Sequence, residues 1–367
     1  MNTQIQDKFT FKNGQTMRNR VVLAPMTICA SEPGGYVSQA DIDFFARRSR
    51  SVGMVITGST YVHPLGKSFA ESFSGAEDDK IEGLSRLAKA IKDQGALAIV
   101  QLYHGGRMVL PDLIDGQPVA PSAVKAPRDY LAEPRALKNA EVEQVIEDFL
   151  SAIRRAIQAG FDGVELHAAN TYLIQQFVSP HSNVRKDKWG GSLNNRLRFP
   201  KTLLKRAKQL VKEEADRPFL IGYRFSPEEI EEPGIQLYDT LQLLEQLIYH
   251  QVDYLHISTS DVWRSSIRDS QDSEPVIQKI IRKINGRVPL IGVGLIETKQ
   301  DAQRVLDAGI PLFALGKALL LDPDWTEKVI SGRESEVIRA YRDELQADLA
   351  LPTAFVEDAR SYLEGKD

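Results

Sequence analysis

Eight short apolar runs, separated by longer amphipathic stretches, constrain the fold of this chain more than any other feature of its sequence. The runs are rich in Val, Ile and Leu and lack strict apolar–polar alternation, which is typical of parallel strands covered on both faces. They lie at Val21–Met26, Met54–Ser59, Leu97–Leu102, Gly163–Leu166, Phe219–Arg224, Tyr254–Ser258, Pro289–Val293 and Leu312–Gly316. Parallel neighbours require long crossover connections, usually helices. We therefore predict one α/β domain over residues 1–367, folded as a (β/α)8 (TIM) barrel.

The stretches between the runs have helical periodicity. Helices are predicted at Ser38–Arg50, Asp78–Asp93, Glu141–Ala159, Arg196–Glu213, Leu237–Tyr249 and Glu274–Asn285. Ser38 precedes Asp41 by three residues, a signal similar to a capping box. Residues 331–367 are predicted to form a C-terminal helical extension, with helices at Glu334–Ala347 and Phe355–Tyr362. A doubly wound sheet is the alternative, but the first run ends in Pro25-Met26-Thr27 and lacks the glycine-rich phosphate loop of that fold.

Three segments fall outside the strand–helix repeat. The stretch 9–17 contains Asn13-Gly14 and is predicted to be a hairpin that closes the bottom of the barrel. Residues 104–138 and 168–196 form long insertions after the third and fourth strands. Both insertions are expected on the C-terminal face of the barrel, where enzymes of this fold place their active sites.

Composition excludes several classes of protein. The 46 basic and 50 acidic residues give a net charge of −4 without a block of one sign, so neither nucleic acid nor a membrane surface is an expected partner. The single cysteine, Cys29, cannot form an intramolecular disulfide or ligate a cluster, and no metal is predicted. The N-terminus has no apolar core for a signal peptide, and no apolar run is long enough to span a bilayer. We expect a cytoplasmic protein, and a homo-oligomer is compatible with the sequence.

Polar residues and glycines at the strand ends form the candidate site. Gly294 and Gly316 would form the phosphate site usual in barrels, with Lys317 adding a positive charge. Hydrogen bonds and one fixed cation, such as the pyrimidine edge of a flavin needs, would come from Thr27, Gln101 and Arg224. Two donors that could converge on one oxygen, and a phenolic proton, would come from His167, Asn170 and Tyr172.

Simpler interpretations exist for these residues. Glycine ends many strands without binding phosphate, and Arg224 could be the ion-pair partner of Glu165. Cys29 is expected to be an inert, small apolar residue. The remaining histidines that we considered are expected to be packing or surface residues: His63, His104, His181 and His250. A barrel without redox chemistry, either a lyase or a sensor that binds a phosphate ligand, is the alternative function.

The segment from Gly160 to Arg196 resembles the signature of the old yellow enzyme family. It contains Gly-Phe-Asp-Gly-Val-Glu-Leu-His-Ala-Ala-Asn-Thr-Tyr and later Gly190-Gly191-Ser192 and Asn195-Arg196. The stretches 19–27 and 101–107 resemble the first and third strands of that family, and the resemblance runs from about residue 8 to about residue 330. A larger relative, the dienoyl-CoA reductase, has further domains and an iron–sulfur cluster. It is excluded because a chain with one cysteine cannot ligate such a cluster.

The resemblance implies tightly but non-covalently bound FMN, with NADH or NADPH as the reductant. Its FMN-binding positions are Pro25, Met26, Thr27, Gly58, Gln101, His167, Arg224, Gly294, Gly316 and Lys317. It also implies that His167 and Asn170 bind the carbonyl oxygen of an α,β-unsaturated substrate, that Tyr172 donates the proton, and that Tyr103 shapes the pocket. Enones are the expected substrates and quinones further ones, reduced by a ping-pong hydride transfer. Lys317 replaces an arginine common in the family, and lysine lacks its bidentate fork.

Overall fold

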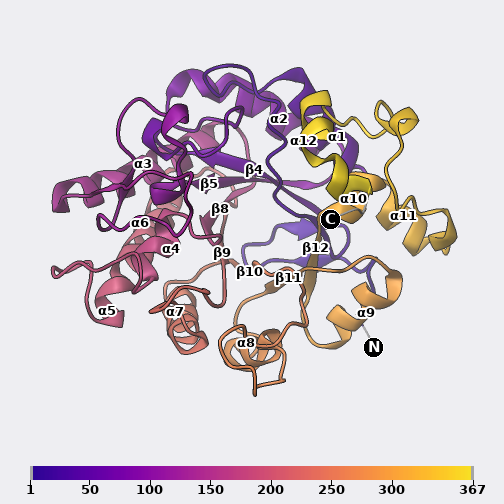
Figure 1. The fold of residues 1–367 in the computed structure, drawn as a ribbon. Coiled ribbons are helices and arrows are strands. Elements are labelled where there is room, and N and C mark those ends of the chain that lie inside the picture. The colour runs from indigo at the N-terminus through magenta and orange to yellow at the C-terminus, as the bar shows by residue number, and fades with distance from the viewer. Residues whose placement is uncertain (1–2, 365–367) are drawn as a thin grey trace.

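The computed structural model describes residues 3–364, and within them eight parallel strands close into a barrel (Figure 1). The strands are β3 (Val21–Leu23), β4 (Met54–Tyr61), β5 (Leu97–Tyr103), β8 (Gly163–Ala168), β9 (Leu220–Phe225), β10 (Tyr254–Ile257), β11 (Leu290–Val293) and β12 (Leu312–Leu315). Each strand pairs with the next along the chain, and β12 pairs with β3 to close the ring. The predicted (β/α)8 barrel is confirmed.

Helices surround the barrel, as Figure 1 shows in a view along its axis. They are α1 (Gln39–Ser49), α2 (Ile81–Asp93), α3 (Asn139–Gln158), α6 (Arg198–Glu214), α7 (Leu237–Tyr249), α8 (Val276–Ile284), α9 (Lys299–Asp307), α10 (Lys317–Leu321) and α11 (Trp325–Ile330). The capping box expected at Ser38 is present, because its hydroxyl accepts from the backbone of Asp41 while the Asp41 carboxylate accepts from the backbone of Ser38. No helix among residues 3–364 combines the length and the apolar character that a bilayer span requires.

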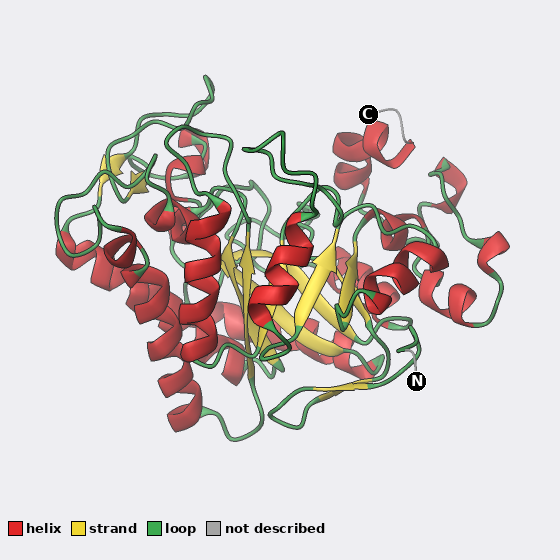
Figure 2. Cartoon of the chain, turned by 90° about the horizontal axis from the view of Figure 1, so that it is seen from below, coloured by secondary structure: helices red, strands yellow, loops and turns green. Residues whose placement is uncertain are grey.

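The N-terminal hairpin plugs the bottom of the barrel. Strands β1 (Phe9–Thr10) and β2 (Thr16–Met17) pair antiparallel across the Asn13-Gly14 turn. The side chains of Phe11 and Met17 are buried against apolar lumen residues that include Met54 and Leu220 at the N-terminal ends of their strands. Figure 2 shows this hairpin at one end of the barrel and the long loops at the other.

The two insertions lie on the C-terminal face, as predicted. The first contains 3-10 turns at Gly106–Met108 and Pro111–Leu113 and a short parallel pair, β6 (Val119–Ala120) with β7 (Arg135–Ala136). The second contains α4 (Leu173–Val178) and α5 (Leu193–Arg196). The buried guanidinium of Arg107 joins the two, since it donates to the carbonyl of Val124 and lies 3.1 Å from Nδ1 of His181.

The C-terminal extension is less helical than predicted. Glu334–Ala347 contains only 3-10 turns at Glu334–Glu336 and Asp343–Leu345, so the helix predicted there is wrong. Hydrogen bonds to the ends of barrel helices take the place of hydrogen bonds within a helix. Ile338 donates its N–H to Asp322, and Glu334 accepts from the backbone of Lys299. The second predicted helix is confirmed as α12 (Thr353–Glu364), which lies beside α10 (Figure 1). The last three residues of the predicted extension, 365–367, lie outside the described part.

Candidate active site

A layer of polar side chains fills the upper lumen of the barrel, above the apolar plug. Side chains alternate along a strand, so residues two apart point to the same face. Gln101 on β5 lies level with Glu165 on β8, and His167 on β8 lies level with Arg224 on β9, which is level with His256 on β10. Four of these five residues are fully buried, and Arg224 is partly exposed. The C-terminal half of the lumen therefore concentrates hydrogen-bonding groups and charge.

Gln101, Glu165 and His256 form a buried hydrogen-bond chain. Nε2 of Gln101 donates to the Glu165 carboxylate at 2.8 Å, and Nδ1 of His256 lies 2.9 Å from the other carboxylate oxygen. Burial opposes the charge on Glu165, but His256 and Arg224 outweigh it and hold the pKa of this carboxyl below its usual value. Burial lowers the pKa of His256, so the neutral ring donates its Nδ1–H to an ionised carboxylate. The sequence allowed an ion pair between Arg224 and Glu165. Among residues 3–364, Glu165 instead hydrogen-bonds to Gln101 and His256, and Arg224 hydrogen-bonds to Ser258.

Ser258 connects Arg224 to Asn170. A terminal guanidinium nitrogen of Arg224 donates to the Ser258 hydroxyl at 3.2 Å, and this hydroxyl donates to Oδ1 of Asn170 at 2.9 Å. The Asn170 carbonyl oxygen is thereby occupied, which leaves its amide N–H groups for a ligand. Asn170 and Thr171 both have positive φ, of 56° and 64°, an uncommon conformation for non-glycine residues. The backbone N–H of Asn170 donates to Ser226 and its side chain accepts from Ser258, so this turn directs Asn170 toward the segments that follow β9 and β10.

His167 and Tyr172 belong to an aromatic cluster at the mouth of the barrel. Their ring centroids are 4.9 Å apart, and the Tyr172 ring lies 5.2 Å from that of Tyr103. Burial lowers the pKa of His167 well below its usual value, so the imidazole is neutral, and its buried Nδ1 has no partner among the described residues. Burial raises the pKa of Tyr172 to about 12, so the phenol keeps its proton at neutral pH. Tyr103 is fixed, because its hydroxyl accepts from the backbone of Ser68.

The segment that follows β3 packs tightly against β4. A Cβ on Gly58 would come within 2.6 Å of the Met26 carbonyl oxygen, so only glycine fits there. Thr27, next to Met26, accepts a hydrogen bond from the backbone of Ser59 and keeps its own hydroxyl proton for a ligand. Pro25, Met26 and Thr27 are all partly exposed. The structure thus presents this segment at the surface where the sequence predicts contacts with FMN.

The predicted phosphate cradle lies after β11 and β12. Gly294 has a φ of 116° and its Cα packs against the backbone of Ser260, so a side chain there would clash. Gly316 caps the N-terminus of α10, and the Lys317 ammonium lies 4.8 Å from the ring centroid of Tyr362 on α12. The lysine that was predicted to neutralise phosphate therefore contacts the C-terminal helix in this structure.

A cavity of about 380 Å³ opens beside Asn170 at the C-terminal face. Its other lining residues come mainly from the loops after β9 and β10: Arg128, Thr171, Gln175, Ser226, Glu228, Glu229, Ile230, Glu231, Ser258, Thr259, Ser260, Arg264 and Ile267. Three glutamates and two arginines are thus among the residues that line this cavity. The cavity is large enough for a small substrate or for part of a nicotinamide coenzyme.

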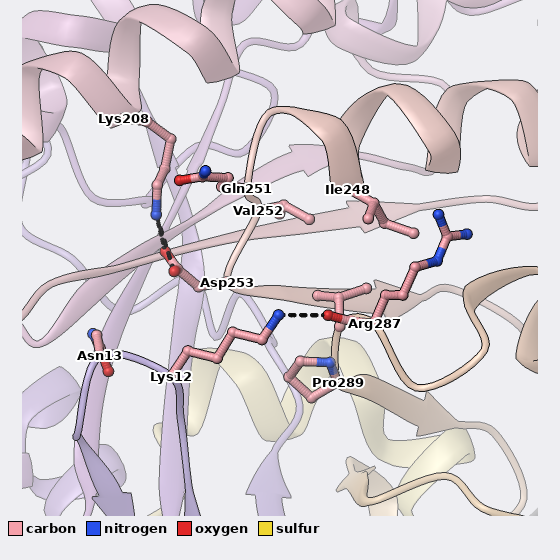
Figure 3. Close-up of a pocket in the computed structure, with 10 residues that line it drawn as sticks. Lys12, Asn13, Lys208, Ile248, Gln251, Val252, Asp253, Arg287 and Pro289 are labelled. Carbon is pink, nitrogen blue, oxygen red and sulfur yellow. Dashed lines mark hydrogen bonds and ion pairs between the residues drawn. The ribbon is translucent and has the colours of Figure 1, made fainter.

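A larger cavity, of about 460 Å³, lies at the opposite end of the barrel (Figure 3). Its polar side chains bind one another: Lys208 contacts Asp253, and Lys12 donates to the carbonyl of Arg287, whose guanidinium binds Glu245. The cavity lies beside the hairpin turn and the N-terminal ends of β10 and β11. Enzymes of this fold place their active sites at the opposite, C-terminal ends of the strands. We therefore assign the functional site to the C-terminal face.

The sequence prediction missed several residues of this site. His256, Ser258 and Ser59 were not singled out, although Tyr254, His256 and Ser258 alternate along a strand and so share the lumen face. Phe69, whose ring lies 6.5 Å from that of Tyr172, comes from a loop that gives no such signal. The four histidines expected to be structural lie away from the lumen layer; His104, for example, is buried and accepts from the backbone of Gly106.

Comparison with known proteins identifies relatives along most of the chain. The model of the NADH:flavin oxidoreductase / NADH oxidase family matches residues 7–336. A protein of Bacillus subtilis named "Probable NADH-dependent flavin oxidoreductase YqiG" is 45% identical over 90% of this chain and 89% of its own length. The structure of the old yellow enzyme homologue from Zymomonas mobilis superposes with a TM-score of 0.79 at 27% identity, over 90% of this chain and 93% of that one.

A longer relative contains this barrel as one part. The NADH:fumarate oxidoreductase of Klebsiella pneumoniae is 47% identical over 92% of this chain, but the alignment spans only 37% of that protein. The activity in its name therefore belongs to a protein of which this chain matches about a third.

Proposed function

The chain belongs to the NADH:flavin oxidoreductase / NADH oxidase family, the family of the old yellow enzymes, and from this premise we propose that it reduces activated carbon–carbon double bonds with NAD(P)H. The observation that carries the proposal is the group of donors that follows β8: the rings of His167 and Tyr172 lie 4.9 Å apart, and Ser258 holds the side-chain oxygen of Asn170, which leaves its amide N–H groups for a ligand. The cofactor of the family is FMN, which, when bound, supplies reversible hydride transfer.

The donors present in the lumen suit FMN. Gln101 keeps one N–H and one acceptor lone pair unused, the pattern that complements an N–H beside a carbonyl. The buried Nε of Arg224 has no partner among the described residues, and an unpaired buried donor is costly unless a ligand satisfies it. The backbone at Gly294 and Leu295 has positive φ at two successive residues, a conformation that suits a loop whose N–H groups bind an anion.

His167 and Asn170 are assigned to the carbonyl oxygen of the substrate. Negative charge develops on that oxygen as the β-carbon accepts a hydride, so N–H donors fixed in advance stabilise the transition state more than the ground state. The Arg224–Ser258–Asn170 chain fixes the direction of the Asn170 amide. The same two donors would hold the amide oxygen of nicotinamide in the other half of a ping-pong cycle.

Tyr172 is assigned as the general acid. Its phenol is protonated at neutral pH, and its ring is fixed between those of His167 and Tyr103. In this mechanism the Tyr172 hydroxyl gives its proton to the α-carbon of the substrate and regains one from water.

Uncharged enones suit the cavity beside Asn170 better than dicarboxylates do. The carboxyl groups of Glu228, Glu229 and Glu231 outnumber the guanidinium groups of Arg128 and Arg264 in its lining, so this cavity offers no excess of positive charge to hold a dianion. The fumarate activity in the name of the longer relative is consequently not our assignment for this barrel. We propose enones such as cyclohexenone as substrates, with quinones as further acceptors.

The test is a spectrum followed by two titrations. The purified protein should show a flavin absorption spectrum, heat should release FMN near one per chain, and anaerobic NADH or NADPH should bleach the colour. Cyclohexenone should restore it faster than fumarate does. A colourless protein that takes up no FMN would support the alternative, a phosphate-binding barrel without redox chemistry.

A further inference from the structure

Two buried ionisable residues of the lumen are not used by the mechanism above. Glu165 and His256 are completely buried, with Nδ1 of His256 2.9 Å from the Glu165 carboxylate; Glu165 lies two residues before His167 on β8, and His256 is level with Arg224. Taking a carboxylate out of water carries a desolvation penalty that its partners must offset. Apolar residues fill the lumen directly below, so packing alone does not require a charge here.

We propose that the Glu165–His256 pair positions Gln101 and offsets the charge of Arg224, and that it thereby sets the reduction potential and the affinity of the bound FMN. The proposal rests on the proposed function, because it presumes that FMN binds over Gln101 and Arg224. Both residues act through others, so they are positioning residues.

Two hydrogen bonds fix the orientation of the Gln101 amide. The Ser59 hydroxyl donates to its Oε1 at 3.2 Å, while its Nε2 donates to Glu165 at 2.8 Å. If the amide rotated by half a turn, its oxygen would face the carboxylate, and two acceptors would oppose each other. Glu165 therefore determines which side of Gln101 offers the free N–H and which offers the free lone pair.

The Glu165 carboxylate also offsets the positive charge of Arg224. Arg224 binds Ser258, so its positive charge is not neutralised by direct contact. The Glu165 carboxylate lies one layer below it, on the neighbouring strand β8, and their mutual attraction stabilises the charge on Glu165. Charges in a buried lumen are weakly screened. The carboxylate thus weakens the positive field that reduced FMN, the more negative form, would experience.

His256 maintains that carboxylate. Its Nδ1–H is the second donor to Glu165, at 2.9 Å from Oε2, and the buried phenol of Tyr254 also interacts with this carboxylate. If this donor is removed, Glu165 is expected to take up a proton, which abolishes its negative charge and leaves only its carbonyl oxygen to accept from Gln101. A substitution of His256 should therefore resemble a substitution of Glu165.

The experiment measures the midpoint potential of bound FMN by equilibration with a reference dye, which requires no substrate. Glu165→Gln keeps the shape and one acceptor but removes the charge. We expect it to favour reduced over oxidised FMN by roughly tenfold, which raises a two-electron potential by about 30 mV. Arg224→Gln should shift the potential in the opposite direction.

Matched variants separate this role from a general effect on stability. Asp162→Asn removes a buried carboxylate at the other end of the same strand, where Asp162 pairs with Lys92, and should leave the potential unchanged. His256→Gln retains an N–H donor and should resemble the wild type, whereas His256→Leu should resemble Glu165→Gln.

A double-mutant cycle tests the positioning of Gln101. Glu165→Leu, which removes the acceptor as well as the charge, should raise the dissociation constant of oxidised FMN about tenfold in the wild-type background. The same substitution should have little effect in a Gln101→Leu background, because the residue on which Glu165 acts is then absent. The melting temperature of the FMN-free protein reports any purely structural effect.

The outcomes are distinguishable. An unchanged potential in both Glu165→Gln and His256→Leu, with FMN still bound and still reduced by NADH, would overturn the inference and leave the proposed function intact. A lower melting temperature of the FMN-free protein without a change in potential would assign the pair a structural role only. If Glu165→Gln does not fold, the contrast between His256→Leu and His256→Gln decides. A wild-type protein that binds no FMN would instead overturn the proposed function.

Discussion

The rings of His167 and Tyr172 lie edge to face with their centroids 4.9 Å apart, although a turn containing two residues of positive φ separates them along the chain. The contact brings a neutral imidazole and a protonated phenol to the same side of the barrel mouth. It makes the two roles separable by substitution, because Phe at 172 would preserve the ring packing and remove only the proton.

Tyr172→Phe should leave the reduction of FMN by NAD(P)H nearly unchanged, because that step requires no proton at carbon. Oxidation by cyclohexenone should slow by roughly 10²-fold or more, the usual contribution of a positioned general acid. Oxidation by a quinone, whose oxygens take protons from water, should be spared. Stopped-flow measurement of both half-reactions checks this, and equal slowing of the two halves would refute the role of proton donor.

Asn170→Ala should impair both half-reactions, since in the proposed mechanism the same N–H donor serves coenzyme and substrate in turn. Each lost hydrogen bond to a developing charge is worth roughly 1.5–3 kcal/mol, or about tenfold to a hundredfold in rate. Ser258→Ala should have a smaller effect of the same kind, because it only frees the Asn170 amide to rotate. Steady-state kcat/KM with NADH and with cyclohexenone measures both variants. A normal rate in Asn170→Ala would exclude this residue from the site.

Lys317 should influence FMN retention together with Tyr362. If the ammonium binds phosphate, Lys317→Ala should accelerate FMN release by roughly tenfold or more, since a charge-assisted contact is worth about 1.5–3 kcal/mol. Tyr362→Leu removes the ring that the ammonium contacts in this structure and should slow release, because the lysine then has no competing partner. Fluorescence of released FMN follows both rates. Unchanged release in Lys317→Ala would mean that backbone N–H groups alone hold the phosphate.

Acid should destabilise the protein from about pH 6.5 downward. Burial lowers the pKa of His104 to about 3 and also lowers the pKa values of His167 and His256. Below the unfolded pKa of about 6.5 the unfolded chain takes up protons that the folded chain does not, so the free energy of unfolding falls by about 1.4 kcal/mol per pH unit for each such histidine. Urea unfolding at saturating FMN between pH 7.5 and 5 measures this slope. His104→Gln should reduce the slope by about one proton, and an unchanged slope would show that His104 does not contribute.

The sequence by itself determined the barrel, the hairpin plug and the residues at the strand ends. Hydrophobic periodicity is a local property, and in a (β/α)8 barrel it fixes which end of each strand carries the site. The same local signals predicted a helix at Glu334–Ala347, where contacts of Ile338 and Glu334 with the barrel prevail.

Only the tertiary structure decided how the site residues are paired. Glu165 binds Gln101 and His256 rather than Arg224, Ser258 orients Asn170, and Lys317 contacts Tyr362. The four hydrogen bonds that join Gln101 to Glu165, His256 to Glu165, Arg224 to Ser258 and Ser258 to Asn170 link residues between 34 and 91 positions apart in the chain. Their proximity depends on the register of neighbouring strands, which brings side chains level across the lumen. Register arises from the closure of the whole barrel and leaves no local signal in the sequence.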